Sequence, residues 1–129
     1  MRYIVDTHAL VWYIIDDPRL GNEARQILDN PSAQLVIPTI VLAEAKHISE
    51  RKRIPISFDD IMQTIAADAR VTLFSLDIFV VAGMPENLDI HDGLIVATAF
   101  SAQRLFAEEI AILTRDEMIT TSNQLPVVW

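Results

Sequence analysis

Short apolar segments rich in strand-forming residues alternate with helical stretches along the chain, and this alternation most constrains the fold. Helical periodicity fills the stretches between the first four strand candidates, in helices of roughly 10 to 15 residues. Strands joined in this way form right-handed crossovers and a parallel sheet with helices on both faces. The sequence therefore predicts a three-layer α/β/α domain with a mainly parallel sheet of four or five strands, at residues 2–6, 35–37, 71–74, 110–114 and 127–129.

Length and composition fit one domain, which we place at residues 1–129. Of the 129 residues, 51% are hydrophobic, which is enough to build a single core. The absence of cysteine excludes disulfides and thiolate-bound metals and is compatible with a reducing compartment. No apolar run approaches the 18 or more residues of a membrane-spanning helix, and Asp6 stands where a signal peptide would continue its apolar stretch. We expect a cytoplasmic protein with no membrane partner.

The charge balance is acidic. Ten lysines and arginines stand against eighteen aspartates and glutamates, for a net charge of −8. This balance argues against holding nucleic acid by bulk positive charge, so a nucleic-acid partner would need bound cations or local basic residues. Four basic residues gather toward the end of the helix predicted from Thr39, where they are either nucleic-acid contacts or a solvated face that compensates the helix dipole: Lys46, Arg51, Lys52 and Arg53.

Acidic residues follow two of the predicted strands. Asp6 and Asp116 stand there, and ligands of open parallel sheets collect at the carboxyl ends of strands. Asp92 lies in the first turn of a predicted helix that should open on the same edge, with Asp89 as its N-cap. Glu44 lies in an otherwise apolar helical stretch, where an unpaired charge is costly. We expect these acids to share one site.

Carboxylates that converge on one edge repel one another unless a cation lies among them. Hard oxygen donors without cysteine favour Mg²⁺ or Mn²⁺. One or two such ions can activate water and stabilise the attacking and leaving oxygens of a phosphodiester displacement. The pattern therefore indicates metal-dependent hydrolysis of a nucleic-acid backbone.

Each acid also has a purely structural interpretation. Asp6 and Asp89 could cap the helices that follow them, and Asp92 could interact with the helix dipole. Asp116 could be a turn residue after its strand. Glu44 could form an ion pair with Lys46 or extend to solvent.

Four segments match the motifs of a known family in order and spacing. They are DTHALVW at 6–12, DGLIVATA at 92–99, LTRD at 113–116 and VVW at 127–129. In these segments the chain resembles the PIN domains, and among them the VapC-like toxin ribonucleases of type II toxin–antitoxin systems. Two positions depart from the pattern: Glu44 lacks the tryptophan often seen before this acid, and Gly93 stands where many relatives carry arginine.

The resemblance implies a Mg²⁺- or Mn²⁺-dependent endoribonuclease that acts on RNA, has an antitoxin protein as partner and forms a homodimer. Lys46, Arg51, Lys52 and Arg53 would then be candidate RNA contacts. The metal ligands and catalytic residues that the resemblance implies are Asp6, Glu44, Asp92 and Asp116, supported by Thr114 and Asp89.

Other functions of similar folds are less compatible with the residues present. A phospho-acceptor receiver domain needs a lysine after a late strand, and the only lysines are Lys46 and Lys52. A haloacid-dehalogenase-type phosphatase needs a second aspartate two residues after the first, where His8 stands. A catalytically silent PIN-like module that binds RNA or protein stays open as the alternative, and metal affinity would distinguish it.

Overall fold

Five parallel strands form one central sheet in the order β3-β2-β1-β4-β5. The computed structural model describes all residues from Met1 to Trp129, and the predicted parallel sheet is confirmed. The strands lie close to the predicted positions: β1 (Arg2–Val5), β2 (Gln34–Pro38), β3 (Val71–Phe74), β4 (Ile110–Leu113) and β5 (Val127–Val128).

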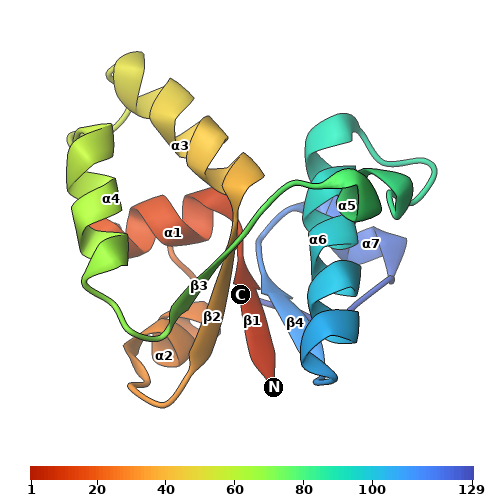
Figure 1. Ribbon diagram of the computed structural model, residues 1–129. Coiled ribbons are helices and arrows are strands. Elements are labelled where there is room, and N and C mark those ends of the chain that lie inside the picture. Colours follow the sequence, from red (N-terminus) through yellow and green to blue (C-terminus); the bar gives the residue numbers. More distant parts are fainter.

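Helices cover both faces of this sheet, which confirms the three-layer α/β/α architecture (Figure 1). Helices α1 to α4 lie on one face of the sheet, where α1 contacts α2, α3 and α4. Helices α5, α6 and α7 lie on the opposite face. No helix combines the length and the apolar character that crossing a membrane requires. The helices are α1 (Thr7–Ile14), α2 (Asn22–Asp29), α3 (Thr39–Glu50), α4 (Phe58–Ala66), α5 (Ile78–Ala82), α6 (Ile90–Phe106) and α7 (Glu117–Ser122).

Local capping explains where several helices begin. Ser57 and Asp60 form a reciprocal capping box at the start of α4, and Asp89 caps α6 as predicted. Helix α7 has no counterpart among the predicted elements, because its six residues are too short to show helical periodicity.

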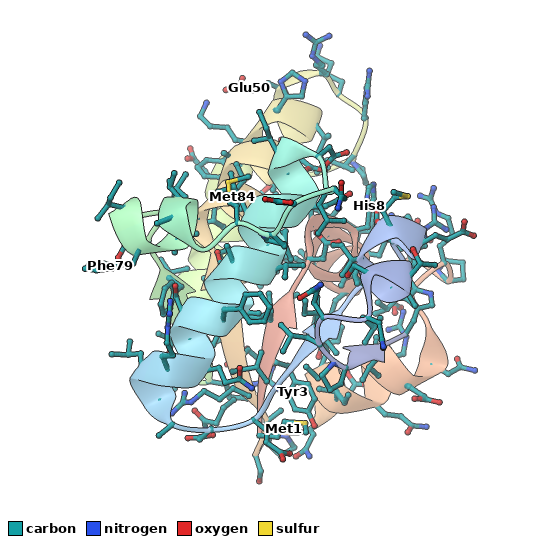
Figure 2. All side chains as sticks on the ribbon, turned by 90° about the vertical axis from the view of Figure 1, so that its right-hand side faces the viewer. Met1, Tyr3, His8, Glu50, Phe79 and Met84 are labelled. Atoms are coloured by element: carbon teal, nitrogen blue, oxygen red, sulfur yellow. The ribbon has the colours of Figure 1, made fainter.

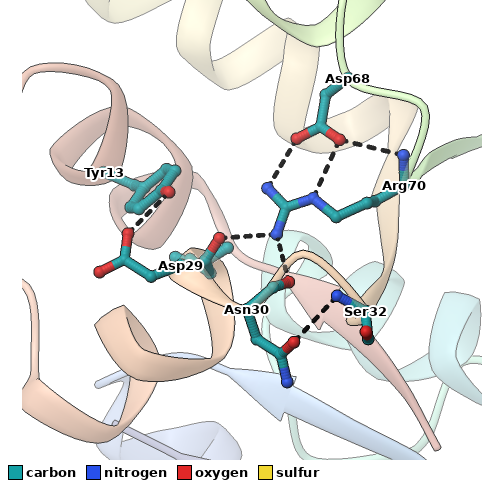
Figure 3. A network of polar contacts seen from close by, with 7 residues as sticks. Tyr13, Asp29, Asn30, Ser32, Asp68 and Arg70 are labelled. Carbon is teal, nitrogen blue, oxygen red and sulfur yellow. Dashed lines mark hydrogen bonds and ion pairs between the residues drawn. The ribbon is translucent and has the colours of Figure 1, made fainter.

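In the sequence, Ser57 as an N-cap and the acids after it predict a helix that extends to about Arg70. The structure differs at the end of this helix. The helix ends at Ala66, because Asp68 turns the backbone by accepting hydrogen bonds from the amide and the guanidinium of Arg70. The same guanidinium donates to the carbonyl oxygens of Leu28 and Asn30, each at 2.7 Å (Figure 3). Arg70 therefore fastens the turn before β3 to the end of α2, in a role that is structural.

The strand order reverses between β1 and β4. From β1 the chain proceeds outward through β2 to β3, whereas β4 and β5 lie on the other side of β1. At such a reversal the connections after two neighbouring strands lead away from each other and leave a crevice at their carboxyl ends. Hydrogen bonding between β1 and β4 continues to the edge of this crevice, where the Asp6 amide donates to the Leu113 carbonyl oxygen at 3.2 Å.

Gly21, the residue before α2, provides the first prediction. A Cβ at this position would lie 2.6 Å from Cδ1 and 2.8 Å from Cγ of Trp129, although its φ of −63° suits alanine. We expect Gly21→Ala to displace Trp129 and to lower the free energy of unfolding by about 1–3 kcal/mol, the usual cost of overpacking. Urea denaturation measures the loss.

Gly83→Ala is the matched control, because a Cβ there would meet only one tight contact, the Phe79 carbonyl oxygen at 3.2 Å. We expect a smaller loss of stability for this variant. Equal losses for the two variants would contradict the contact with Trp129 as the cause.

Candidate functional site

Asp6 lies where β1 ends and α1 begins. Its Oδ1 accepts a hydrogen bond from the Thr7 amide at 2.7 Å, and its Oδ2 accepts one from the Thr114 hydroxyl at 2.6 Å. The residue is only 8% exposed. Burial raises the pKa of the carboxyl, and the bonds from Thr114 and Thr7 oppose that rise by stabilising the charged form.

Asp116 is joined to Asp6 through Thr114. The Thr114 hydroxyl donates to Asp6 and accepts from the Asp116 amide at 3.0 Å. The Asp116 carboxylate caps α7 by accepting from the Met118 and Ile119 amides at 2.8 and 3.0 Å. The two strand-end acids therefore share one hydrogen-bonded unit, and capping positions them at the edge.

Asp92 faces the same site from the first turn of α6. Its amide donates to Asp89 Oδ1 at 3.1 Å, so Asp89 fixes the start of the helix. Burial raises the pKa of the Asp92 carboxyl to about 6, and the negative charges of Asp116 and Asp89 add to that rise. Asp92 is thus electrostatically coupled to the acid that follows β4.

Glu44 reaches the site from α3 and forms an ion pair with Nε2 of His91. A hydrogen bond from His91 lowers the pKa of Glu44, and the same bond raises the pKa of His91 to about 9, so the pair is ionised at neutral pH. His91 Nδ1 also lies 3.7 Å from Asp92 Oδ1. The predicted alternative of a Glu44–Lys46 pair is wrong, because Lys46 pairs with Glu50.

Sequence reasoning did not identify His91 as part of this constellation. Its position beside Asp92 in the first turn of α6 is the only available indication, and nothing in the sequence shows that it faces α3. In the structure His91 is the cation that pairs with Glu44 and lies near Asp92.

The donor set suits a hard divalent cation. Four carboxylates of the same region supply oxygen ligands and no sulfur. Burial raises the pKa values of Asp6 and Asp92, and a bound cation would offset this cost of burying their charges. As the side chains lie, no group of three or more acidic or histidine side chains converges closely enough to hold an ion. Ligation by Glu44 would require it to leave His91.

A pocket of about 310 Å³ opens beside Asp6 and Asp116, at the crevice between β1 and β4. Its wall is mostly polar and includes neither Glu44 nor Asp92. The lining residues are Asp6, His8, Ala9, Thr114, Arg115, Asp116, Glu117 and Trp129.

The four candidate RNA contacts lie apart from this pocket. Lys46, Arg51, Lys52 and Arg53 are all exposed, in the second half of α3 and the turn after it. Arg51 lies roughly 10 Å beyond Glu44 along the helix axis, at 1.5 Å per residue. Figure 2 labels Glu50 at this end of α3 and His8 at the sheet edge.

Comparison with known proteins gives a family and a structural neighbour. The PIN domain family matches residues 3–121, and no curated protein matches the sequence. A solved structure described as FitAB bound to an IR36 DNA fragment has a TM-score of 0.66 at 18% sequence identity. The match covers 98% of this chain and 93% of the other, and at this identity it supports the fold.

Thr114 provides a test of how the strand-end acids are held. Thr114→Val removes a buried bond to a carboxylate, and we expect a loss of about 1.5–3 kcal/mol in the free energy of unfolding. Thr98→Val is the matched control, because Thr98 is equally buried at 2% exposed but donates to a neutral oxygen, the Leu94 carbonyl. For Thr98→Val the free energy of unfolding should fall by only about 0.5–1.5 kcal/mol. Equal losses in urea denaturation would contradict the charged bond.

Proposed function

The chain belongs to the PIN domain family, and from this premise we propose that it is a metal-dependent endoribonuclease that hydrolyses RNA phosphodiester bonds. The main supporting observation is the hydrogen-bonded link from Asp6 through Thr114 to Asp116 at the strand reversal. Asp92 is coupled by charge to Asp116, and Glu44 to Asp6. These couplings support a single acidic site.

We assign ligation of Mg²⁺ or Mn²⁺, and with it catalysis, to Asp6, Glu44, Asp92 and Asp116. The bound ion would supply an activated water and neutralise charge on the phosphate. Thr114 orients the Asp6 carboxylate, and Asp89 orients Asp92 by capping α6. Ligation by Glu44 would require it to leave His91, whose raised pKa depends mainly on its contact with Glu44.

We further propose that the protein is the toxin of a toxin–antitoxin pair, with an antitoxin protein as partner and the cytoplasm as its location. The VapC-like motifs support this role. A homodimer is supported by exposed apolar side chains around the edge strand β3 and helix α5, where Phe79 points outward (Figure 2). These side chains are Leu73, Leu76, Ile78, Phe79 and Val81.

The decisive experiment is cleavage of a labelled mixed RNA pool with Mn²⁺, with Mg²⁺ and with EDTA. We expect cleavage with either metal and none in EDTA. Asp92→Asn removes a ligand charge and should abolish cleavage and weaken Mn²⁺ binding measured by calorimetry. Asp59→Asn is the matched control, because Asp59 is exposed on α4 and should leave both unchanged.

Cleavage that persists in excess EDTA or in Asp92→Asn would overturn the proposal. No cleavage together with no Mn²⁺ binding would favour the alternative, a catalytically silent module that binds RNA or protein.

We also propose that Arg51, Lys52 and Arg53 contact the RNA backbone, with a smaller share for Lys46, whose charge is paired with Glu50. Each phosphate contact with a single strand adds about 0.7 to the slope of log affinity against log salt. Changing all three residues to glutamine should therefore lower the slope by up to about 2, whereas Lys46→Gln should change it little. An unchanged slope for the triple variant would remove this segment from the interface.

A further inference from the structure

His91 is the one basic residue in ion-pair contact with any of the four proposed metal ligands. Its Nε2 pairs with the Glu44 carboxylate, and its Nδ1 lies 3.7 Å from Asp92 Oδ1. Glu44 belongs to α3 and Asp92 to the first turn of α6. The imidazole therefore lies between two carboxylates that a metal ion would have to bring together.

This contact joins the two helical layers of the molecule. Helix α3 lies on one face of the sheet and α6 on the other, and the two helices contact each other (Figure 1). The pair of Glu44 with His91 is the one ion pair between them. If Glu44 bound an ion that Asp92 also binds, the ion would replace this link between α3 and α6.

The Nε2 atom of His91 is shielded from water, and the Glu44 carboxylate is the one charged group in contact with it. If Glu44 turned to a metal ion, this nitrogen would lose its partner without gaining a water molecule. A buried polar group that loses its partner costs free energy. Ligation by Glu44 therefore carries a cost that His91 imposes.

The four proposed ligands fall into two spatial pairs. Asp6 and Asp116 line the pocket at the crevice, whereas Glu44 and Asp92 do not, and no three of these side chains converge closely enough to hold an ion. The two acids outside the pocket are the two that His91 contacts. The position of His91 thus coincides with the division of the ligand set.

We propose that His91 competes with the divalent cation for Glu44, so that their ion pair sets the concentration of Mn²⁺ or Mg²⁺ at which the site fills. His91 is in this role a positioning residue that acts through Glu44. The ion binds with all four ligands only in molecules whose Glu44 has left His91. Its apparent Kd rises in proportion as that fraction becomes smaller.

This inference rests on the proposed function, because it takes Glu44 and Asp92 as metal ligands. It adds a means of regulation to the same site, which is a threshold in metal concentration that depends on one histidine.

Calorimetric titration with Mn²⁺ tests the competition. His91→Gln removes the cation and should tighten Mn²⁺ binding about tenfold, which is at the low end of the contribution of a hydrogen bond to a charged group. His91→Lys keeps a cation and should bind Mn²⁺ about as tightly as the unmutated protein. His47→Gln is the matched control, because His47 is exposed on α3, forms no ion pair and should leave the affinity unchanged.

Glu44→Gln shows whether His91 acts through Glu44. In this background His91→Gln should leave the Mn²⁺ affinity nearly unchanged, because the carboxylate for which the two cations compete is gone. An equal gain in both backgrounds would mean that the charge of His91 repels the ion directly, and this result would overturn the proposal. Weaker Mn²⁺ binding in His91→Gln alone would overturn it as well, because His91 would then support the ion.

Urea denaturation with and without Mn²⁺ separates competition from a merely structural role. Without metal, His91→Gln should be less stable than the unmutated protein, because the ion pair is lost. At saturating Mn²⁺ most of this loss should disappear, because an ion that binds the folded state more tightly stabilises it more. An equal loss under both conditions would contradict the proposal.

The nuclease and the competition can fail separately. Metal-dependent cleavage of RNA, with a Mn²⁺ affinity that His91→Gln leaves unchanged, would remove the competition and keep the nuclease. A gain in Mn²⁺ affinity in His91→Gln, without cleavage of RNA by either protein, would keep the competition and remove the nuclease. No Mn²⁺ binding by either protein would overturn both.

Discussion

The hydrogen bond from Thr114 to Asp6 holds together the part of the molecule on which the proposed site depends. It joins the carboxyl ends of β1 and β4, the neighbouring strands at which the strand order reverses. The connections after these strands diverge, so no backbone fills the space between them. Polar groups at the strand ends must therefore form hydrogen bonds with one another. Thr114 does so for both strand ends, and Asp6 and Asp116 in turn cap α1 and α7. The fold and the site are therefore stabilised by the same contacts.

Three of the four proposed ligands fall into two electrostatic classes. Asp6 and Asp92 are buried and have raised pKa values, whereas Glu44 is held charged by His91. The difference follows from position, because only Glu44 lies on the helix that faces His91. A divalent cation would favour the charged forms of Asp6 and Asp92 and would compete with His91 for Glu44. His91 thus acts as an internal counter-ion that limits repulsion, at the cost of engaging one of the proposed ligands.

The sequence predicted what depends on local pattern. Apolar segments that end on Asp6 and near Asp116 indicated the strands and the sheet edge at which they end. The capping roles of Ser57 and Asp89 followed from their positions just before helical stretches. Contacts between distant elements were beyond such reasoning. His91 meets Glu44 only because α6 and α3 approach each other across the sheet edge, and Trp129 reaches the pocket because β5 pairs with β4. The end of α4 was misjudged because Asp68 and Arg70 form a local turn that competes with helix.

Burial of Trp12 connects the core to the surface chemistry. The ring is 3% exposed and belongs to the hydrophobic core, yet the guanidinium groups of Arg19 and Arg115 lie over it. Stacking stabilises an arginine without consuming its hydrogen-bond donors, so a stacked guanidinium can still bind an anion. Asp17 uses the donors of Arg19, and no carboxylate uses those of Arg115. An acidic protein can in this way keep one cation in place beside its carboxylates, where an ion pair would otherwise have cancelled it.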